Sequence, residues 1–151
     1  MSLSKDINQT KFRSEYSKAM LNILFTNNWL TEKTRNHLDR FDLTTQQFNI
    51  LRILRGAGSP LSTLQIRQRM LDKMSDTSRI VDRLVKKKLV EKVVCPSDRR
   101  LVDVTISDKG HSLLAEIDVL EPEWETLFFN LTEEEASELN RLLDKLRNST
   151  D

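Results

Sequence analysis

The side chains best suited to chemistry in this chain of 151 residues lie between residues 75 and 110. On a helical repeat, residues 75–86 place a polar and mostly basic set of side chains on one side: Ser75, Arg79, Asp82, Arg83 and Lys86. The opposite side is mostly apolar and is expected to face the core: Thr77, Ile80, Val81, Leu84 and Val85. Because arginine and short hydroxyl side chains bind phosphates and base edges, this helix is a candidate reader of nucleic acid.

The start of this helix is predicted at Ser75, whose hydroxyl can accept a hydrogen bond from a backbone N–H group of the first turn. Residues 76–79 then form its leading edge, and this edge carries the side chains that would enter a groove first.

Two segments rich in β-branched residues follow, at residues 90–95 and 101–106, and they predict a β-hairpin. The tip of the hairpin ends in Arg99 and Arg100. A helix in a major groove, with a basic tip on the backbone or in a neighbouring minor groove, would contact duplex DNA at two places.

Four blocks in this region resemble, in order, the signature of the MarR family of bacterial winged-helix repressors. They are Thr-Ser-Arg-Ile-Val-Asp-Arg-Leu at 77–84, Lys-Lys-Leu-Val-Glu at 87–91, Ser-Asp-Arg-Arg-Leu at 97–101 and Ile-Ser-Asp-Lys-Gly at 106–110. The sequence departs from that signature at Lys88, where the family usually has glycine, and at Ile106 and Ser107, which replace the commoner Leu-Thr. If position 88 has a left-handed backbone, lysine there costs about 1 kcal/mol relative to glycine.

The resemblance implies a mainly α-helical winged helix-turn-helix fold with a small β-hairpin wing. It implies a single domain over residues 1–151, with dimerisation helices at about 1–40 and 107–151 and a DNA-binding lobe at about 41–106. It also implies a homodimer, whose two-fold symmetry would present two basic helices to successive major grooves roughly 34 Å apart on a nearly palindromic operator.

We expect eight side chains to contact double-stranded DNA, six on or beside the helix and two at the hairpin tip: Ser75, Thr77, Ser78, Arg79, Arg83, Lys86, Arg99 and Arg100. Thr77 also falls on the core side of the helical repeat. Asp76 and Asp82 are expected to orient neighbouring arginines. The alternative for the tip is a local salt bridge to Asp98 that only shapes the turn.

Charge is segregated along the chain, although the formal net charge is only +1. Residues 65–100 carry 11 basic and 5 acidic side chains, whereas residues 101–151 carry 4 basic and 13 acidic ones. A basic centre beside an acidic C-terminal part is the pattern expected when one surface meets phosphate. Each charged run, considered alone, is more often a solvated helix surface.

The rest of the chain predicts helices around this centre. Residues 9–38 contain no glycine or proline, and they predict one long helix with two apolar stripes. Three capping boxes predict helix starts at Thr44 with Gln47, Ser62 with Gln65, and Thr132 with Glu135. A helix is also expected after Ser107.

The last helix repeats leucine on one stripe, at Leu139, Leu142, Leu143 and Leu146. This stripe and those of the first helix predict a dimer interface, since a small winged helix does not need apolar stripes at both chain ends. The alternative is that the stripes cover one another within one chain.

The sequence offers no constellation typical of an enzyme. His37 and His111 are not at metal-ligand spacing from each other or from Cys95, and no glycine-rich phosphate loop or nucleophile elbow is present. We therefore expect neither catalysis nor a bound metal or cofactor. A redox role for Cys95 through the geometry of the wing is a hypothesis, and the single cysteine excludes an internal disulfide.

The resemblance also implies a small aromatic or phenolic ligand, bound where the first helix meets the DNA-binding lobe. Phe25, Trp29 and His37 are the candidate contacts, while ordinary packing is the alternative reading of the two aromatic residues.

The sequence thus predicts a DNA-binding transcriptional regulator, a homodimeric repressor of palindromic operators. The alternative is a winged-helix protein-interaction module whose basic face contacts an acidic protein. Without an apolar run of membrane-spanning length or a signal peptide, we expect a cytoplasmic protein with no membrane partner.

Overall fold

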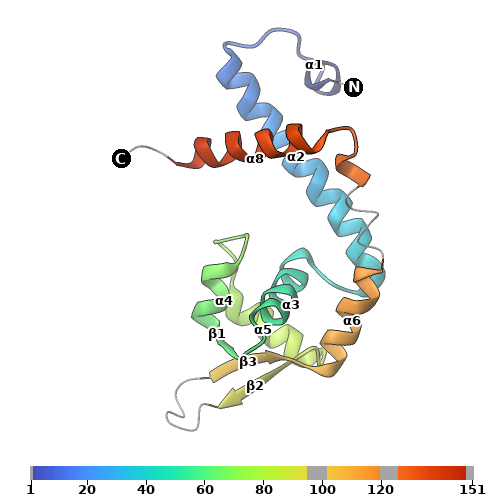
Figure 1. Ribbon diagram of the computed structural model, residues 1–151, viewed down its shortest axis with the longest axis vertical. Coiled ribbons are helices and arrows are strands. Elements are labelled where there is room, and N and C mark those ends of the chain that lie inside the picture. Colours follow the sequence, from blue (N-terminus) through green and yellow to red (C-terminus); the bar gives the residue numbers. More distant parts are fainter. Residues whose placement is uncertain (1, 95–101, 120–125, 149–151) are drawn as a thin grey trace.

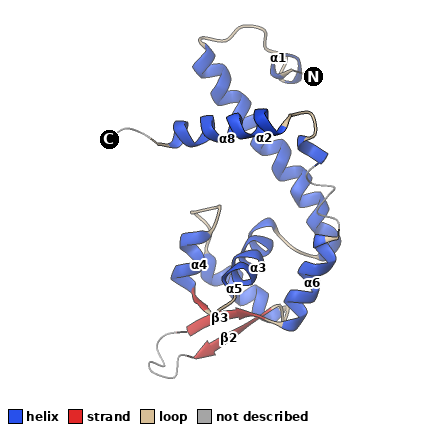
Figure 2. Cartoon of the chain, viewed as in Figure 1, coloured by secondary structure: helices blue, strands red, loops and turns tan. Residues whose placement is uncertain are grey.

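The computed structural model of the chain describes residues 2–94, 102–119 and 126–148. Figure 1 shows two parts, a lobe built around a small sheet and an arm formed mainly by the long helix α2 (Glu15–Leu38) and the last helix α8 (Glu133–Arg147). Helix α6 (Asp108–Asp118) leads from the lobe toward the arm. The fold is mainly helical, as predicted, and Figure 2 shows the strands confined to one side of the lobe.

The N-terminal segment differs from the single helix predicted for residues 9–38. It forms a short helix α1 (Leu3–Asp6), and α2 begins only after Ser14. The Ser14 hydroxyl accepts a hydrogen bond from the Ser17 backbone N–H at 3.1 Å. This capping bond defines the helix start in a segment where composition alone allows a longer helix.

The three predicted capping boxes are all present, at Thr44 with Gln47, Ser62 with Gln65, and Thr132 with Glu135. They open α3 (Thr45–Ala57), α4 (Thr63–Arg69) and α8. In each, the polar side chains satisfy backbone N–H groups that a helix start leaves without partners. Helix α3 ends at Gly58, where φ is +62° and a residue without a side chain is favoured.

The sheet has the strand order β1-β3-β2, all antiparallel. The predicted hairpin is present as β2 (Val90–Val94) and β3 (Val102–Ile106), with Val90 opposite Ile106. Strand β1 (Leu61–Ser62), which pairs Leu61 with Val104, is too short to be read from an alternating pattern. The hairpin is therefore anchored to the start of α4.

The core of the lobe is formed by apolar residues from Leu38 to Ile117. Apart from Leu38 at the end of α2, its fully buried members come mainly from α3, α4, α6, β2, β3 and the helix α5 (Thr77–Lys86), and they include Ile50, Ile66, Leu84, Val104 and Leu114. Helix α2 contributes only His37 and Leu38 to the buried residues, and α8 contributes none. The arm therefore lies outside this core.

The junction between α5, the sheet and α6 explains the Ile-Ser-Asp-Lys-Gly block. A Cβ atom at Gly110 would lie 2.3 Å from the Leu89 carbonyl oxygen, so only glycine allows α6 to approach this closely. The Ser107 hydroxyl donates to the Lys88 carbonyl at 2.8 Å and accepts from the Gly110 N–H at 3.0 Å. This motif is structural, since it joins α6 to the end of α5.

Among the described residues, no helix is both long enough and apolar enough to cross a membrane.

Candidate nucleic-acid interface

Helix α5 has the amphipathic character that the sequence predicts. Thr77, Val81 and Leu84 are buried on its inner side. The outward side chains are exposed, and they are Ser78, Arg79, Asp82, Arg83 and Lys86. Helices α3 and α4 pack against the inner side of α5, so its basic side faces the exterior and is accessible to a partner.

The helix begins one residue later than predicted, because Asp76 rather than Ser75 is its N-cap. The Asp76 carboxylate accepts from the Arg79 backbone N–H at 3.3 Å, and it also pairs with Arg79 Nε at 3.2 Å. A carboxylate here also interacts favourably with the positive end of the helix dipole. Asp76 is thus paired with an arginine, as the expected orienting role requires, and the Arg79 side chain remains 81% exposed.

Thr77 is a correction to the predicted set of DNA contacts. Its side chain is buried, with 3% of its surface exposed, and its hydroxyl lies in the interior without a hydrogen-bond partner. The methyl group of threonine suits this apolar position against the lobe. Thr77 is therefore a core residue, as its place on the helical repeat indicated, and not an exposed DNA contact.

Asp82 does not orient an arginine but pairs with Lys92 of β2, at 2.7 Å between Oδ1 and Nζ. The hydrogen bond from Lys92 is the main cause of a lowered Asp82 pKa. This contact links the outer side of α5 to strand β2 of the hairpin.

The end of α5 is held by a left-handed residue at Lys88, where φ is +60°. The Leu89 N–H donates to the Leu84 carbonyl at 3.0 Å and the Lys88 N–H to the Val85 carbonyl at 2.9 Å, which is a Schellman motif. The condition stated for position 88 in the sequence analysis is thus met, and lysine carries the steric cost that glycine would avoid.

Lys87 connects this end of α5 to the corner between α2 and α3. Its Nζ lies 2.9 Å from the Asp42 carboxylate and also donates to the Asp42 carbonyl oxygen. Asp42 itself has φ of +53° and ends the 3-10 turn η1 (Asp39–Phe41) that follows α2. The position of α5 is thereby tied to the end of the long helix.

A second tie joins the lobe to α6. Arg55 near the end of α3 forms a bidentate pair with Asp118, at 2.5 Å from Nη1 to Oδ2 and 3.1 Å from Nη2 to Oδ1. Both side chains are about one third exposed. Neither tie was expected from the sequence, since 63 residues separate Arg55 from Asp118 and 45 separate Lys87 from Asp42.

A hollow of about 400 Å³ lies between α4 and the start of α5, and it adds residues to the interface that the sequence did not single out. Thr63 and Arg67 of α4 line it together with Ser75, Asp76 and Ser78. The sequence signal that could have identified Thr63 and Arg67 is the Ser62 capping box. It marks the start of α4, which is the helix before α5 in the helix-turn-helix. Cys95, Arg99 and Arg100 lie outside the described residues.

The three residues expected at a small-ligand site all lie on α2. Phe25 and Trp29 are one helical turn apart and are 39% and 37% exposed. His37 lies two turns further along and is buried, with its ring 6.0 Å from that of Phe41. Phe25 and Trp29 thus lie on the same side of α2, one turn apart, while His37 lies apart from them in the buried part of the helix.

A basic helix held by a helix-turn-helix and followed by a hairpin defines a winged helix-turn-helix protein. A family model described as MarR family matches residues 41–101. A MarR transcription factor from Planctomyces limnophilus is 31% identical in sequence, and the match covers 89% of this chain and 98% of that one with a TM-score of 0.68. The chain belongs to the MarR family of DNA-binding transcriptional regulators, which are not enzymes.

Two further solved structures share the fold at lower identity. A mutant MarR from E. coli in complex with operator DNA has a TM-score of 0.78 at 24% identity, covering 91% of this chain and 99% of that chain. An organohalide-sensing regulator in its 2,4-dichlorophenol-bound form has a TM-score of 0.81 at 22% identity, covering 94% of this chain and 87% of that chain. These matches support the architecture.

Proposed function

We propose that this regulator is a cytoplasmic homodimeric repressor that binds nearly palindromic duplex DNA, with one α5 helix in each of two successive major grooves. The observation that carries the proposal is the outward side of α5, whose basic and hydroxyl side chains are exposed while its inner side is buried in the lobe. The structural match that contains operator DNA supports the same use of this fold.

Arg79 and Ser78 are the side chains proposed to read bases, because they lie at the leading end of the helix. Arg83 and Lys86 lie further along the same exposed side and suit phosphate contacts. Ser75 is half-buried beside the hollow between α4 and α5 and is proposed as a backbone contact. Arg99 and Arg100 remain proposed contacts of the hairpin tip.

The arm supports the homodimer. Large apolar side chains of α2 and α8 remain exposed in the single chain, among them Tyr16 at 89%, Met20 at 57% and Leu146 at 65%. Packing within one chain therefore leaves these surfaces uncovered, and a second copy would bury them. We accordingly propose dimerisation helices at about 1–40 and 107–151 around a DNA-binding lobe at about 41–106.

We further propose that a small aromatic or phenolic ligand binds beside Phe25 and Trp29, with His37 at the edge of the lobe. The two exposed rings on one side of α2 support this site, as does the neighbour with bound 2,4-dichlorophenol. A panel of phenols and aromatic acids should contain a compound that raises the unfolding temperature, and the rise should be lost in Trp29→Ala. If no member of the panel raises it, this ligand class is wrong.

The DNA-binding proposal is tested by selecting sites from random duplexes and measuring affinity by fluorescence anisotropy at two salt concentrations. Arg79→Ala should weaken binding by about 1–3 kcal/mol at the selected site, because a bidentate base contact is lost. Arg40→Ala, an exposed arginine on η1, is the matched control and should change affinity little. Equal losses in both variants would contradict the assignment, and a reporter assay with the selected site tests repression.

A further inference from the structure

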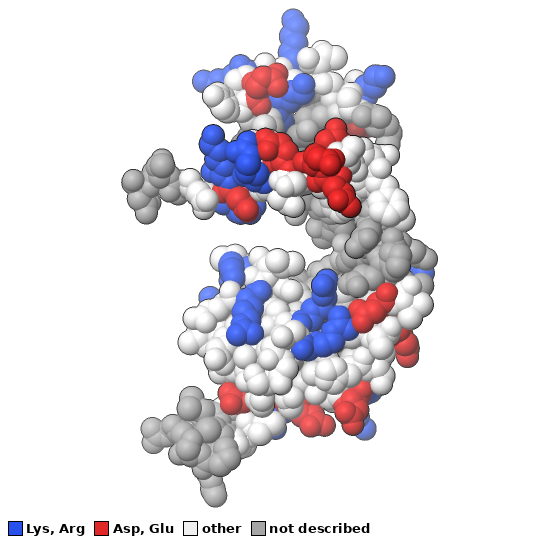
Figure 3. Space-filling view, viewed as in Figure 1, with Lys and Arg blue, Asp and Glu red and all other residues white. Residues whose placement is uncertain are grey.

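The leading end of α5 carries a carboxylate, although this end is proposed to enter a groove between phosphates. The side chain of Asp76 is 57% exposed, and it lies three residues before Arg79. Figure 3 shows Lys and Arg over the lobe as separate groups among uncharged side chains rather than as one continuous patch. A negative charge among so few positive ones opposes attraction to DNA. Capping alone does not require this charge, since serine or asparagine caps a helix as well.

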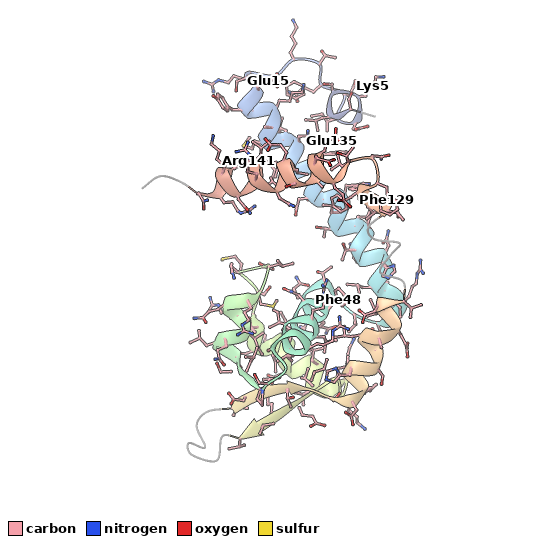
Figure 4. The ribbon with its side chains drawn as sticks, viewed as in Figure 1. Lys5, Glu15, Phe48, Phe129, Glu135 and Arg141 are labelled. Atoms are coloured by element: carbon pink, nitrogen blue, oxygen red, sulfur yellow. The ribbon has the colours of Figure 1, made fainter. Side chains whose placement is uncertain are left out.

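The lobe holds Asp76 in a fixed position at the start of α5. Asn49, which follows the buried Phe48 on α3 (Figure 4), accepts a hydrogen bond from the Leu71 N–H at 2.9 Å and so secures the turn before α5. On the other side of Asp76, the side chain of Thr77 is buried in the lobe. The backbone at Asp76 is therefore anchored on both sides, while its carboxylate remains at the surface.

The two oxygens of this carboxylate contact different groups of Arg79. Oδ1 accepts from the backbone N–H at 3.3 Å, and Oδ2 lies 3.2 Å from Nε. Within the described part of the chain, no other side chain pairs with this guanidinium. The Nε side thus faces the carboxylate, and the outer edge formed by Nη1 and Nη2 is left for a partner. Two parallel N–H groups on one edge match O6 and N7 of guanine.

We propose that Asp76 is a positioning residue for base recognition, which holds Arg79 so that Nη1 and Nη2 bind O6 and N7 of a guanine. An arginine without such a partner binds the phosphates of any sequence equally well. If Arg79 turned to a phosphate, Asp76 would be left unpaired beside the negative backbone, which is unfavourable. The inference rests on the proposed base contact of Arg79, and it adds the base and the group that enforces the choice.

The test compares Asp76→Asn with the wild type on three duplexes by fluorescence anisotropy. They are the selected site, a random duplex, and the selected site with 7-deazaguanine, which lacks N7, at the position where Arg79→Ala loses base discrimination. The wild type should bind the 7-deazaguanine duplex about tenfold more weakly than the selected site. Asp76→Asn should reduce this ratio at least about threefold and should bind the random duplex more tightly than the wild type does. Its unfolding temperature should be unchanged, because asparagine keeps the cap.

Two further variants separate positioning from charge. Asp82→Asn removes an equal charge from the exposed side of α5, but the partner of Asp82 is Lys92. This control should raise the affinity for all three duplexes and leave the ratio as in the wild type. Asp76→Asn combined with Arg79→Ala should discriminate no differently from Arg79→Ala alone, because Asp76 acts through Arg79.

The outcomes distinguish the inference from the proposed function. A wild-type ratio in Asp76→Asn would overturn the inference and leave Arg79 as a base contact. An equal loss of the ratio in Asp82→Asn would show an effect of charge alone and would also overturn it. If Arg79→Ala keeps its discrimination at every position of the selected site, Arg79 reads no base, and both the inference and the proposed readout are wrong.

Discussion

The lobe and the arm of this protein bury apolar surface in different ways. The lobe closes a core of its own, in which side chains such as Ile50, Leu51 and Leu84 have no exposed surface. The arm consists of two longer helices, α2 and α8, whose buried residues number only His37 and Leu38 among those described. A single chain thus buries the apolar residues of the lobe, which would meet DNA, but leaves those of the arm exposed, where a second copy would bind.

The comparison predicts that a small change in the lobe core affects folding more than any change in the arm. Gly110→Ala should lower the free energy of unfolding by about 3 kcal/mol or more, because the new Cβ would lie 2.3 Å from the Leu89 carbonyl oxygen. Urea unfolding measures it. Gly56→Ala is the control, since nothing lies within 4 Å of its Cβ, and alanine should stabilise α3 by up to about 1 kcal/mol. Similar stability of both variants would contradict the close packing.

The arm should respond in assembly rather than in folding of the lobe. Leu142→Glu places a charge in the shallow apolar groove that Leu131, Leu139 and Leu142 line along α8, and it should weaken dimerisation by about 2 kcal/mol or more. Analytical ultracentrifugation measures the change. Leu64→Glu is the control, because Leu64 is an exposed leucine on α4 of the lobe, and it should leave the dimer unchanged. A dimer that survives Leu142→Glu would place the interface elsewhere.

The ion pair between α3 and the end of α6 should have an intermediate effect on stability. Asp118→Asn removes the negative charge and one of the two accepting oxygens from the bidentate pair with Arg55, and it should destabilise the protein by about 1 kcal/mol, since both groups are partly exposed and screened. A double-mutant cycle with Arg55→Met isolates the pair from the single losses. No coupling in that cycle would show that α6 is held by apolar packing alone.

Lys88 is a position at which a substitution should raise the stability of the lobe. Lys88→Gly should raise the stability by about 0.5–1 kcal/mol, because glycine adopts the φ of +60° without steric cost. Thermal unfolding measures it. Lys86→Gly, two residues earlier and inside α5, should destabilise instead. If both glycines destabilise, the lysine is not strained at this position.

The smallest expected effect concerns Asp82, whose pKa Lys92 lowers. A lowered folded-state pKa means that this group stabilises the protein above its unfolded pKa, and that the contribution disappears as the pH falls through the folded value. An NMR titration should find the Asp82 pKa below the ordinary value, and Lys92→Met should return it. An unshifted Asp82 pKa in the wild type would mean that the bridge to β2 does not persist in solution.

Much of the fold was predictable because its signals are local. Each capping box joins residues three apart, and the alternation of Val102 and Val104 with Asp103 identifies a strand within five residues. The departure from the family pattern at Lys88 raised the question of a left-handed backbone there, and the structure contains one. The exposed side of α5 also follows from its helical repeat.

The predictions were less accurate where neighbouring residues compete for one role. Ser75 and Asp76 are both good N-caps, and the choice of Asp76 depends on where α5 meets the lobe. Thr77 was predicted on both sides of the helix, as a DNA contact and as a core residue, and its burial resolves this. Helix α2 begins later than composition suggested, because Ser14 caps it.

The sequence by itself determined the helix starts, the hairpin, the amphipathic α5 and the segregation of charge, since these depend on residues within one or two turns of each other. Only the tertiary structure decided that Arg55 meets Asp118, that Lys87 meets Asp42, and that Gly110 lies against Leu89. It also decided which apolar stripes the single chain covers and which it leaves exposed. Such contacts depend on how the elements pack, and no local sequence pattern predicts a contact between residues far apart in the chain.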